Sequence, residues 1–378
     1  MNLNILNSTT LHGWSAGSWY VIEMMRGLAQ RGHQIHILVP EGKTADASRD
    51  AGFTVHTSPN LRSVRPFESI RTIRHLKMLR DELIHPDIIL AHYGPDHSWW
   101  GSIMHDRKKR VPLVRVRSHD QRKPSRHPAA SWLNRWRTDA FIVSNEHQRR
   151  AYQRYSGVRA DMVFRAPPGF DLASWNGDSG DRSFRAHCAI SNGTVLIASV
   201  ARFAPQKDHK TFFAAADAIA GRFSDVHFLA AGYPAEFDTA YLEELAGMYP
   251  NLKKKLTIWS ERLPDSHEMV NSADIGVIHS SDSEAICRIV MEFMASSIPI
   301  VSTNIGILPE VIHDGSSGII VPPGNADALA GALLQYLEND VFRHRMGEAG
   351  HGRLKDVFSY GRSVDRLENA LFQIVEQI

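Results

Sequence analysis

Short apolar runs alternate with segments whose apolar residues recur at helical spacing, and this alternation constrains the fold more than any other feature of the sequence. LNILN (3–7), QIHILVP (34–40) and DIILAH (87–92) have the pattern of buried strands, and helical patterns separate them. Strands that alternate with helices predict a parallel sheet covered by helices on both faces. We therefore predict an α/β fold for this part of the chain.

The alternation stops once, at PPGFDLASWNGDSGDRS (167–183), a stretch rich in Pro, Gly, Ser and Asp. It starts again with TVLIASVAR (194–202) and continues through ADIGVIHSS (273–281) to SGIIVPP (317–323). We interpret the interruption as a linker, because 378 residues exceed the size of one ordinary core. The prediction is two tandem Rossmann-like, doubly wound domains that face a cleft, with ligands at the carboxyl ends of the strands.

Basic residues are concentrated in the first half of the chain, although the net charge is only +2. Residues 1–170 contain 26 Lys and Arg against 14 Asp and Glu, and the remainder contains 17 against 27. A basic surface suits nucleic acid, an anionic lipid surface or an acidic substrate, and it can equally be an ordinary solvated face. Composition alone leaves these interpretations open.

Two cysteines, Cys188 and Cys287, are too few for a disulfide framework and indicate a reducing compartment. The N-terminus has neither a basic segment nor a long apolar run, and no apolar run matches the length of a membrane span. We expect a cytoplasmic protein that contacts the inner face of the cytoplasmic membrane at most peripherally. After the first strand, NSTTLHGWSAG replaces G-x-G-x-x-G, which argues against a dehydrogenase with that fingerprint.

Two glutamates, Glu284 and Glu292, lie in an apolar context after the predicted strand 273–281. We predict that Glu284 lies at a strand-to-helix turn and that the N–H groups of Ala285 to Cys287 open the helix as an anion site. A buried Glu292 needs partners, and the two hydroxyls of a ribose are suitable ones. The alternative is that Glu284 is merely a helix N-terminal charge and that Glu292 points to solvent.

Two cations are expected at the same edge of the second sheet. Arg202 ends the segment 194–202 and Lys207 precedes the next helix, so both lie on the side where Glu284 emerges. Two cations beside a helix N-terminus form a plausible diphosphate clamp, and the alternative is a surface loop with scattered charge. The sequence contains no Asp-x-Asp and no His and Cys cluster with metal-ligand spacing, so we expect no metal site.

Together these features resemble the retaining glycosyltransferases of the GT-B fold, in the large family 4 group. The resemblance covers nearly the whole chain and is strongest from Val195 to Gly324. The E-x7-E pattern of the family falls on Glu284 and Glu292, and its Arg and Lys, in a loop of the form GRL-x-x-x-K, fall on Arg202 and Lys207. Four further segments are similar to family segments: HGWSAG (12–17), RGHQIHIL (31–38), VRSHD (116–120) and PEVIHDGSSGIIVPPGN (309–325).

The resemblance implies a metal-independent transfer of a hexosyl or related sugar, with retention, from a donor such as a UDP- or GDP-sugar and without a cofactor. It implies that Arg202 and Lys207 bind the donor diphosphate, that Glu284 grips the sugar and phosphate, and that Glu292 holds the ribose. His119 would face the sugar, although a structural or solvent role suits it about as well. The implied catalytic residues are His119, Arg202, Lys207 and Glu284, and the implied donor-binding residues are Gly17, Arg202, Lys207, Arg262, Glu284, Ile286, Cys287, Arg288 and Glu292.

The family arrangement implies an acceptor-binding domain of residues 1–168 with a C-terminal helix 359–378, and a donor-binding domain of residues 169–358. A basic acceptor domain suits a growing cell-surface glycan or lipid-linked acceptor, as in lipopolysaccharide or polysaccharide biosynthesis, at an anionic membrane, with no nucleic acid as partner. Two alternatives remain, a GT-B sugar-nucleotide epimerase and a non-catalytic glycan- or nucleotide-binding module. Ala285-Ile286-Cys287 motivates the second, since Gly-Phe-Gly is common there in the family, and it puts the choice of donor sugar in question.

Overall fold

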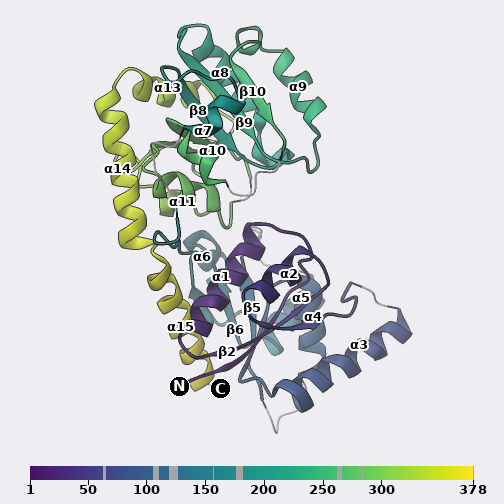
Figure 1. Ribbon diagram of the computed structural model, residues 1–378. Helices are drawn as coiled ribbons and strands as arrows, with labels where there is room; N and C mark the ends of the chain where they lie inside the picture. Colours follow the sequence, from purple (N-terminus) through teal and green to yellow (C-terminus); the bar gives the residue numbers. More distant parts are fainter. Residues whose placement is uncertain are drawn as a thin grey trace. The chain divides into compact units, whose positions relative to one another are not determined.

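The protein forms two compact units, Met1–Gly169 with Tyr360–Ile378 and Phe170–Ser359, in a computed structural model (Figure 1). The structure describes residues 1–62, 65–104, 110–118, 127–155, 157–175, 182–261, 266–282 and 284–377. The domain boundaries expected from the sequence differ from this division by one residue. Among the described residues, none of the helices combines the length and the apolar character that a membrane crossing needs.

The first unit is built on a parallel sheet in the order β3-β2-β1-β4-β5-β6-β7. Its strands are β1 (Asn4–Ser8), β2 (Gln34–Val39), β3 (Thr54–Thr57), β4 (Ile88–Ala91), β5 (Leu113–Arg117), β6 (Ala140–Val143) and β7 (Val163–Arg165). Strands β4 and β6 are buried along their whole length, as expected for a sheet covered on both faces. The strand order reverses direction between β1 and β4, which is the doubly wound arrangement.

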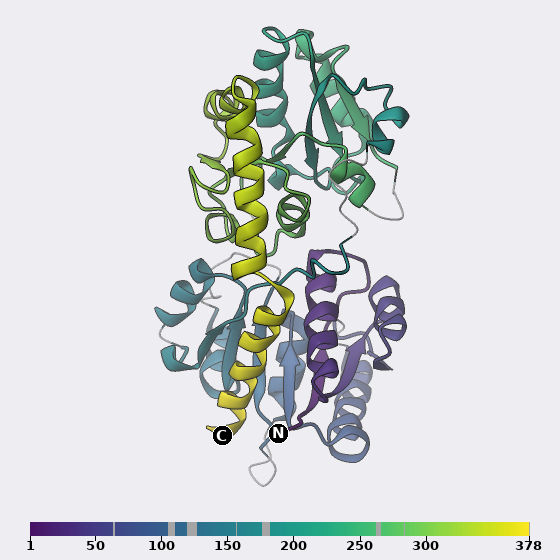
Figure 2. The same ribbon diagram turned by 60° about the vertical axis from the view of Figure 1, so that its left-hand side comes forward.

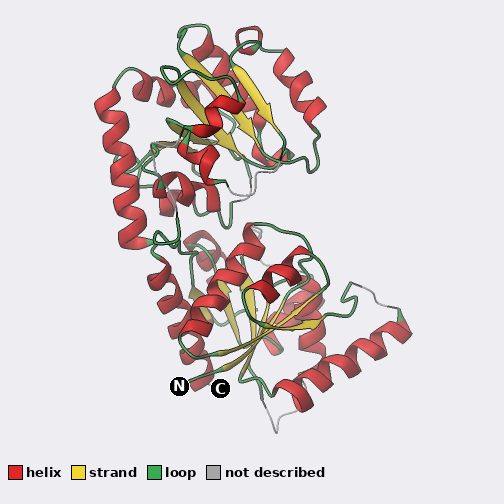
Figure 3. Ribbon diagram, in the orientation of Figure 1, coloured by secondary structure: helices red, strands yellow, loops and turns green. Residues whose placement is uncertain are grey.

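Helices cover both faces of this sheet (Figure 3). They are α1 (Ala16–Gln30), α2 (Lys43–Asp50), α3 (Pro66–Met78), α4 (Gly94–Ile103), α5 (Pro128–Trp136), α6 (Glu146–Gln153) and α15 (Tyr360–Glu376), with the short turns η1 (Leu79–Ile84) and η2 (Ala160–Met162). α1 contacts both α2 and α15, while α3 contacts α4, and Gly101 of α4 faces Leu133 of α5. The α3–α4 side of the sheet has an apolar core that includes Leu76, Trp100 and Leu113.

The C-terminal helix α15 lies beside α1 in the first unit (Figure 2). Gly27 of α1 makes this close approach possible, because a Cβ atom there would lie 2.3 Å from the Cγ2 atom of Val364. At the end of α1, Arg31 forms ion pairs with Asp365 at 2.6 Å and with Glu368 at 2.5 Å. The apolar stripe of α15 and this polar end together fix the helix on the first unit.

The second unit contains a parallel sheet in the order β10-β9-β8-β11-β12-β13. Its strands are β8 (Val195–Val200), β9 (Val226–Ala231), β10 (Leu256–Trp259), β11 (Ile275–Ile278), β12 (Ile300–Thr303) and β13 (Ile319–Val321). Its helices are α7 (Ser183–His187), α8 (His209–Ala220), α9 (Thr239–Gly247), α10 (His267–Asn271), α11 (Arg288–Ala295), α12 (Leu308–Val311), α13 (Ala326–Leu337) and α14 (Asp340–Val357), with the turns η3 (Pro205–Lys207) and η4 (Pro250–Leu252). The predicted fold class, two parallel-sheet α/β domains, is therefore confirmed.

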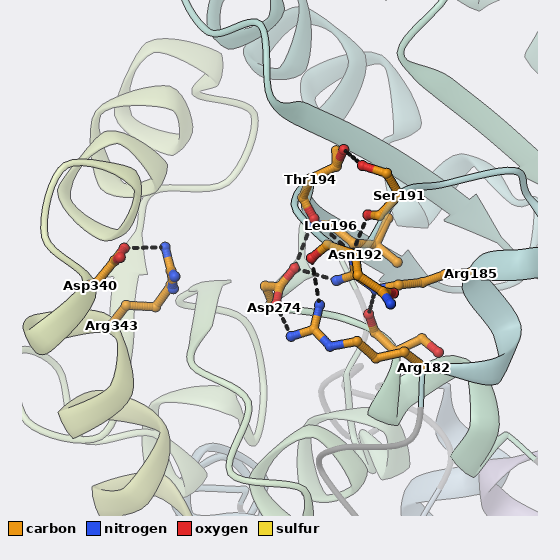
Figure 4. Close-up of polar contacts among 10 residues, drawn as sticks. Arg182, Arg185, Ser191, Asn192, Thr194, Leu196, Asp274, Asp340 and Arg343 are labelled. Atoms are coloured by element: carbon orange, nitrogen blue, oxygen red, sulfur yellow. Dashed lines mark hydrogen bonds and ion pairs between the residues drawn. The ribbon is translucent and has the colours of Figure 1, made fainter.

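Near the start of β8, a buried arginine is held by a carboxylate and by carbonyl groups (Figure 4). Arg185 forms an ion pair with Asp274 and donates to the carbonyls of Ser191 and Thr194 at 3.2 and 2.7 Å. The same carboxylate accepts the N–H of Leu196 at 2.7 Å. The buried charge is thus paired and hydrogen-bonded, which is what burial of a guanidinium requires.

Candidate active site

The candidate site lies at the point in the second sheet where the strand order reverses, between β8 and β11. Arg202 and Lys207 follow β8, and Glu284 follows β11. In doubly wound sheets this crevice, outside the carboxyl ends of the strands, is where ligands bind. The fold therefore gathers three of the predicted site residues at the expected edge.

Lys207 and Glu284 form a buried ion pair at this edge. Ser280, which follows β11, donates its hydroxyl to the same Glu284 oxygen and lies 3.4 Å from Lys207 Nζ. Lys207 ends the turn η3, and Asp208 next to it adopts a left-handed conformation and caps α8 through Thr211. The turn therefore directs the lysine side chain toward the carboxylate.

The charge state of Lys207 follows from this pairing. Burial lowers the pKa of Lys207, but the neighbouring Glu284 and Cys287 together raise it, so the pKa lies above its ordinary value. Burial also raises the pKa of the Cys287 thiol well above its usual range, and the charge of Glu284 adds to the effect. The site thus presents a charged ammonium group beside a thiol that stays protonated.

The segment after Glu284 differs from the prediction. The helix begins at Arg288 with Cys287 as its N-cap, so the N–H groups of Ala285 to Cys287 do not open it. The side chain of Glu284 is held by Lys207, and its carbonyl accepts the N–H of Ile307 at 2.9 Å. These contacts fix the backbone before the helix can start, and the side chains of Ala285, Ile286 and Cys287 are buried.

Glu292 is buried on α11, and the alternative that it points to solvent is wrong. Its carboxylate forms an ion pair with Arg288, one turn earlier, at 2.6 Å and accepts the hydroxyl of Ser266 at 3.0 Å. Gly276 of β11 brings this helix close to the sheet, because a Cβ atom there would lie 2.7 Å from the ring of Phe293. The predicted need for polar partners is met by these protein groups.

The remaining predicted residues do not all lie at this edge. Arg202 is exposed and has no ion pair or hydrogen bond with the residues that the structure describes. Gly17 is the second residue of α1 in the first unit, where a Cβ atom would meet the hydroxyls of Ser15 and Tyr93 at 3.5 Å. His119 and Arg262 lie outside the described residues. Within the described part of the chain, no group of His, Cys, Asp and Glu side chains is arranged to hold a metal ion.

Sequence reasoning missed three polar residues that shape this edge. Ser280 bridges Lys207 and Glu284, and Ser266 contacts Glu292. His279, directly after β11, forms a hydrogen bond of 2.6 Å with Ser199 of β8, and its ring stacks on Phe212. The run HSSDSE (279–284) could have indicated Ser280 and His279, because it places polar side chains directly after an apolar strand.

Comparison with known proteins agrees with this architecture. Residues 17–174 match the family model for Glycosyltransferase Family 4, and residues 181–353 match that for Glycosyl transferases group 1. Among solved structures, Anabaena HepE in complex with UDP and glucose aligns with a TM-score of 0.81 and 15% identity, covering 98% of this chain and 100% of that one. The units are thus those of the GT-B fold. The chain belongs to the group 1, family 4 glycosyltransferases.

Two curated relatives are similar to part of this chain. The alpha-D-kanosaminyltransferase of Streptomyces kanamyceticus is 28% identical over 63% of this chain and 64% of its own length. The D-inositol 3-phosphate glycosyltransferase of Mycolicibacterium gilvum is 28% identical over 61% of this chain and 50% of its own length. The chain thus spans between half and about two thirds of the length of these relatives.

Proposed function

We propose that the protein transfers a sugar, with retention of anomeric configuration, from a nucleotide-sugar donor to a growing cell-surface glycan or a lipid-linked acceptor. The observation that carries the proposal is the buried Lys207–Glu284 pair at the reversal point of the second sheet, in a chain of this family. The presence of UDP and glucose in the structure of HepE supports a nucleotide-sugar donor.

The donor diphosphate is proposed to bind beside Lys207. The ammonium group keeps its charge because Glu284 raises its pKa, and it has three N–H donors. Glu284 and Ser280 accept hydrogen bonds from this ammonium group and hold it in place. In this proposal its remaining N–H donors bind the donor phosphates. Arg202, which is exposed and has no described partner, supplies the second cation. Such preorganised charge stabilises a leaving diphosphate without reorganisation during the reaction.

A thermal-shift screen of nucleoside diphosphates and their sugars tests the donor site. A ligand at 100 times its Kd adds about 2.7 kcal/mol of stability. The ligand that stabilises the wild type is then tested on Arg202→Ala, and on Lys210→Ala as a matched control, because Lys210 is an exposed cation on α8. Equal stabilisation of all three proteins, or none by any nucleotide, contradicts the assignment. Turnover of the donor without acceptor, giving an altered free sugar, would favour an epimerase.

The proposed acceptor class is supported by the surface of α3 and α5. On α3, Phe67 and Ile70 are 89% and 50% exposed and share a helix face with exposed Arg71 and Arg74. Basic helices that expose apolar side chains bind anionic membrane surfaces. We propose that this face of the first unit contacts an anionic bilayer.

Another helix of the first unit, α5, exposes two tryptophans. Trp132 and Trp136 are one turn apart on α5 and are 48% and 65% exposed, with arginine side chains against their rings. Tryptophan is favoured where apolar and aqueous environments meet. Cosedimentation with neutral and anionic vesicles tests the proposal. We expect binding to the anionic vesicles alone, weakened by Phe67→Ser and by salt, whereas equal binding to both kinds of vesicle contradicts it.

A further inference from the structure

A cavity of about 560 Å³ lies in the first unit, between α4 and α5 above strand β5. Its described lining includes two arginines, Arg115 and Arg117, and two histidines, His97 and His127. No Asp or Glu is among the described residues that line it. Its size is that of a small-molecule site, and the described part of its lining is positively charged.

Arg115 is the most unusual group in this cavity. It is 5% exposed, and its one hydrogen bond to the described residues is donated to the carbonyl of Tyr93. It forms no ion pair with any residue described in the structure. Arg185 in the second unit is equally buried but is paired with Asp274, so this fold elsewhere neutralises a buried guanidinium with a carboxylate.

Asp96 offsets this buried charge only in part: burial and the charge of Arg117 lower the pKa of Arg115 to about 10, although the charge of Asp96 acts to raise it. Asp96 is buried at the start of α4, and its two oxygens accept the N–H groups of His92 and Tyr93 at 2.9 and 2.8 Å, which caps the helix. Arg117 lies two residues from Arg115 on β5, so both side chains leave the same face of the sheet. A buried, unpaired charge beside a like charge is costly unless an anion completes the site.

We propose that this cavity binds the phosphoryl group of a ligand that also carries an apolar or sugar body. Arg115 and Arg117 present planar guanidinium groups, which bind two phosphate oxygens at once. Leu133, Trp132 and Tyr152 form the apolar and aromatic part of the lining, and the cavity is larger than a phosphate alone needs. The phosphoryl group comes from a soluble sugar phosphate or from a phosphorylated lipid head group.

The site lies wholly within the first unit, so its test does not depend on the donor site or on turnover. Isothermal titration of the full chain with inorganic phosphate, a hexose 1-phosphate and the unphosphorylated hexose measures binding of the soluble source. Phosphatidylcholine vesicles that contain either phosphatidic acid or an equal charge of oleate measure the lipid source, because oleate supplies negative charge without a phosphate monoester. We expect the probe that bears a phosphate monoester, from one source, to bind more tightly than its counterpart without that group.

Variants connect this binding to the cavity. Arg117→Gln and Arg115→Met should each weaken binding by about tenfold or more, the range for loss of a charge-assisted contact. Arg150→Gln, on an exposed arginine of α6 outside the cavity, should bind like the wild type. Arg117→Gln keeps the test decisive if Arg115→Met does not fold. Absence of binding by every phosphate-bearing probe, or unchanged binding by Arg117→Gln, overturns the proposal.

Discussion

The ammonium group of Lys207 and the carboxylate of Glu284 form a buried ion pair between the turn after β8 and the segment after β11. The side chains are 17% and 5% exposed, so water screens the pair little. The pair joins the two strands that flank the reversal point of the sheet. It therefore has a structural role as well as the proposed role in donor binding.

Removing one member of the pair leaves the other buried and uncompensated. We expect Lys207→Met or Glu284→Gln alone to lower the free energy of unfolding of the second unit by up to about 5 kcal/mol. The double variant should be more stable than the sum of the single changes predicts, because it removes both charges. Urea denaturation of all four proteins measures this coupling. Additive losses would mean that the two side chains do not interact in solution.

Buried histidines make the protein sensitive to mild acid. Burial lowers the pKa of His92 to about 3, and the positive charge of Arg115 adds to this effect, while burial and then Lys207 lower the pKa of His209 to about 4. These rings stay neutral in the folded chain and are protonated in the unfolded chain below about pH 6.5. The unfolded state binds more protons, so stability falls as pH decreases from about 6.5.

The variant His92→Gln isolates one of these groups, whose Nε2 lies 2.7 Å from the side-chain oxygen of Asn7. Between pH 7 and pH 5 we expect the variant to lose about 2 kcal/mol less stability than the wild type. His147→Gln, at an exposed position, serves as the control and should follow the wild type. Urea denaturation at the two pH values gives the comparison, and parallel losses in all three proteins would exclude a buried neutral His92.

Two glycines in helices have opposite expected responses to alanine. A Cβ atom at Gly27 would lie 2.3 Å from Val364 Cγ2 and 3.1 Å from Tyr360 Oη, so Gly27→Ala should destabilise the α1–α15 contact by about 1–3 kcal/mol. At Gly331 in α13 no atom lies within 4 Å, so Gly331→Ala should stabilise by up to about 1 kcal/mol. Thermal denaturation of both variants tests the packing of α15. Similar effects of the two changes would contradict it.

Metal removal tests whether side-chain cations suffice for the proposed reaction. Lys207 and Arg202 are proposed to offset the charge of the leaving diphosphate, so activity should survive dialysis against EDTA. Lys207→Met should lower kcat by about 10²–10³, the range for loss of one preorganised electrostatic contact. Activity is followed by release of nucleoside diphosphate from the donor that the thermal-shift screen selects. Loss of activity in EDTA that Mg²⁺ restores would contradict the proposal.

The sequence predicted the sheets better than the site. Strand and helix patterns located β1, β8 and β11 because apolar periodicity is a local property of the chain. The helix start at Arg288 was not predictable, because it depends on the contacts of Glu284 with Lys207 and Ile307, which are distant in sequence. The burial of Glu292 beside Arg288 was not predictable either, because it also depends on Ser266, which is distant in sequence.

The first unit shows the same limit of local information. Basic composition indicated a cationic surface, but it could not distinguish exposed Arg71 and Arg74 from buried Arg115. Three-dimensional packing decides which arginine is neutralised by a carboxylate and which faces a cavity. In the same way, Trp100 of α4 is fully buried whereas Trp136 of α5 is exposed.

Glu292 allows a last test that separates ribose recognition from a structural role. Its carboxylate already has Arg288 and Ser266 as partners, so a structural role alone would make Glu292→Gln destabilising without changing ligand preference. If the carboxylate also accepts ribose hydroxyls, the wild type should prefer a nucleoside diphosphate over its 2′,3′-dideoxy analogue by about tenfold or more. Glu292→Gln should bind the two compounds nearly equally, because the charged acceptor is gone. Titration calorimetry measures both affinities, and Ser266→Ala, which leaves the charge in place, should keep most of the preference. A preference that is the same in Glu292→Gln as in the wild type would show that the ribose is held elsewhere.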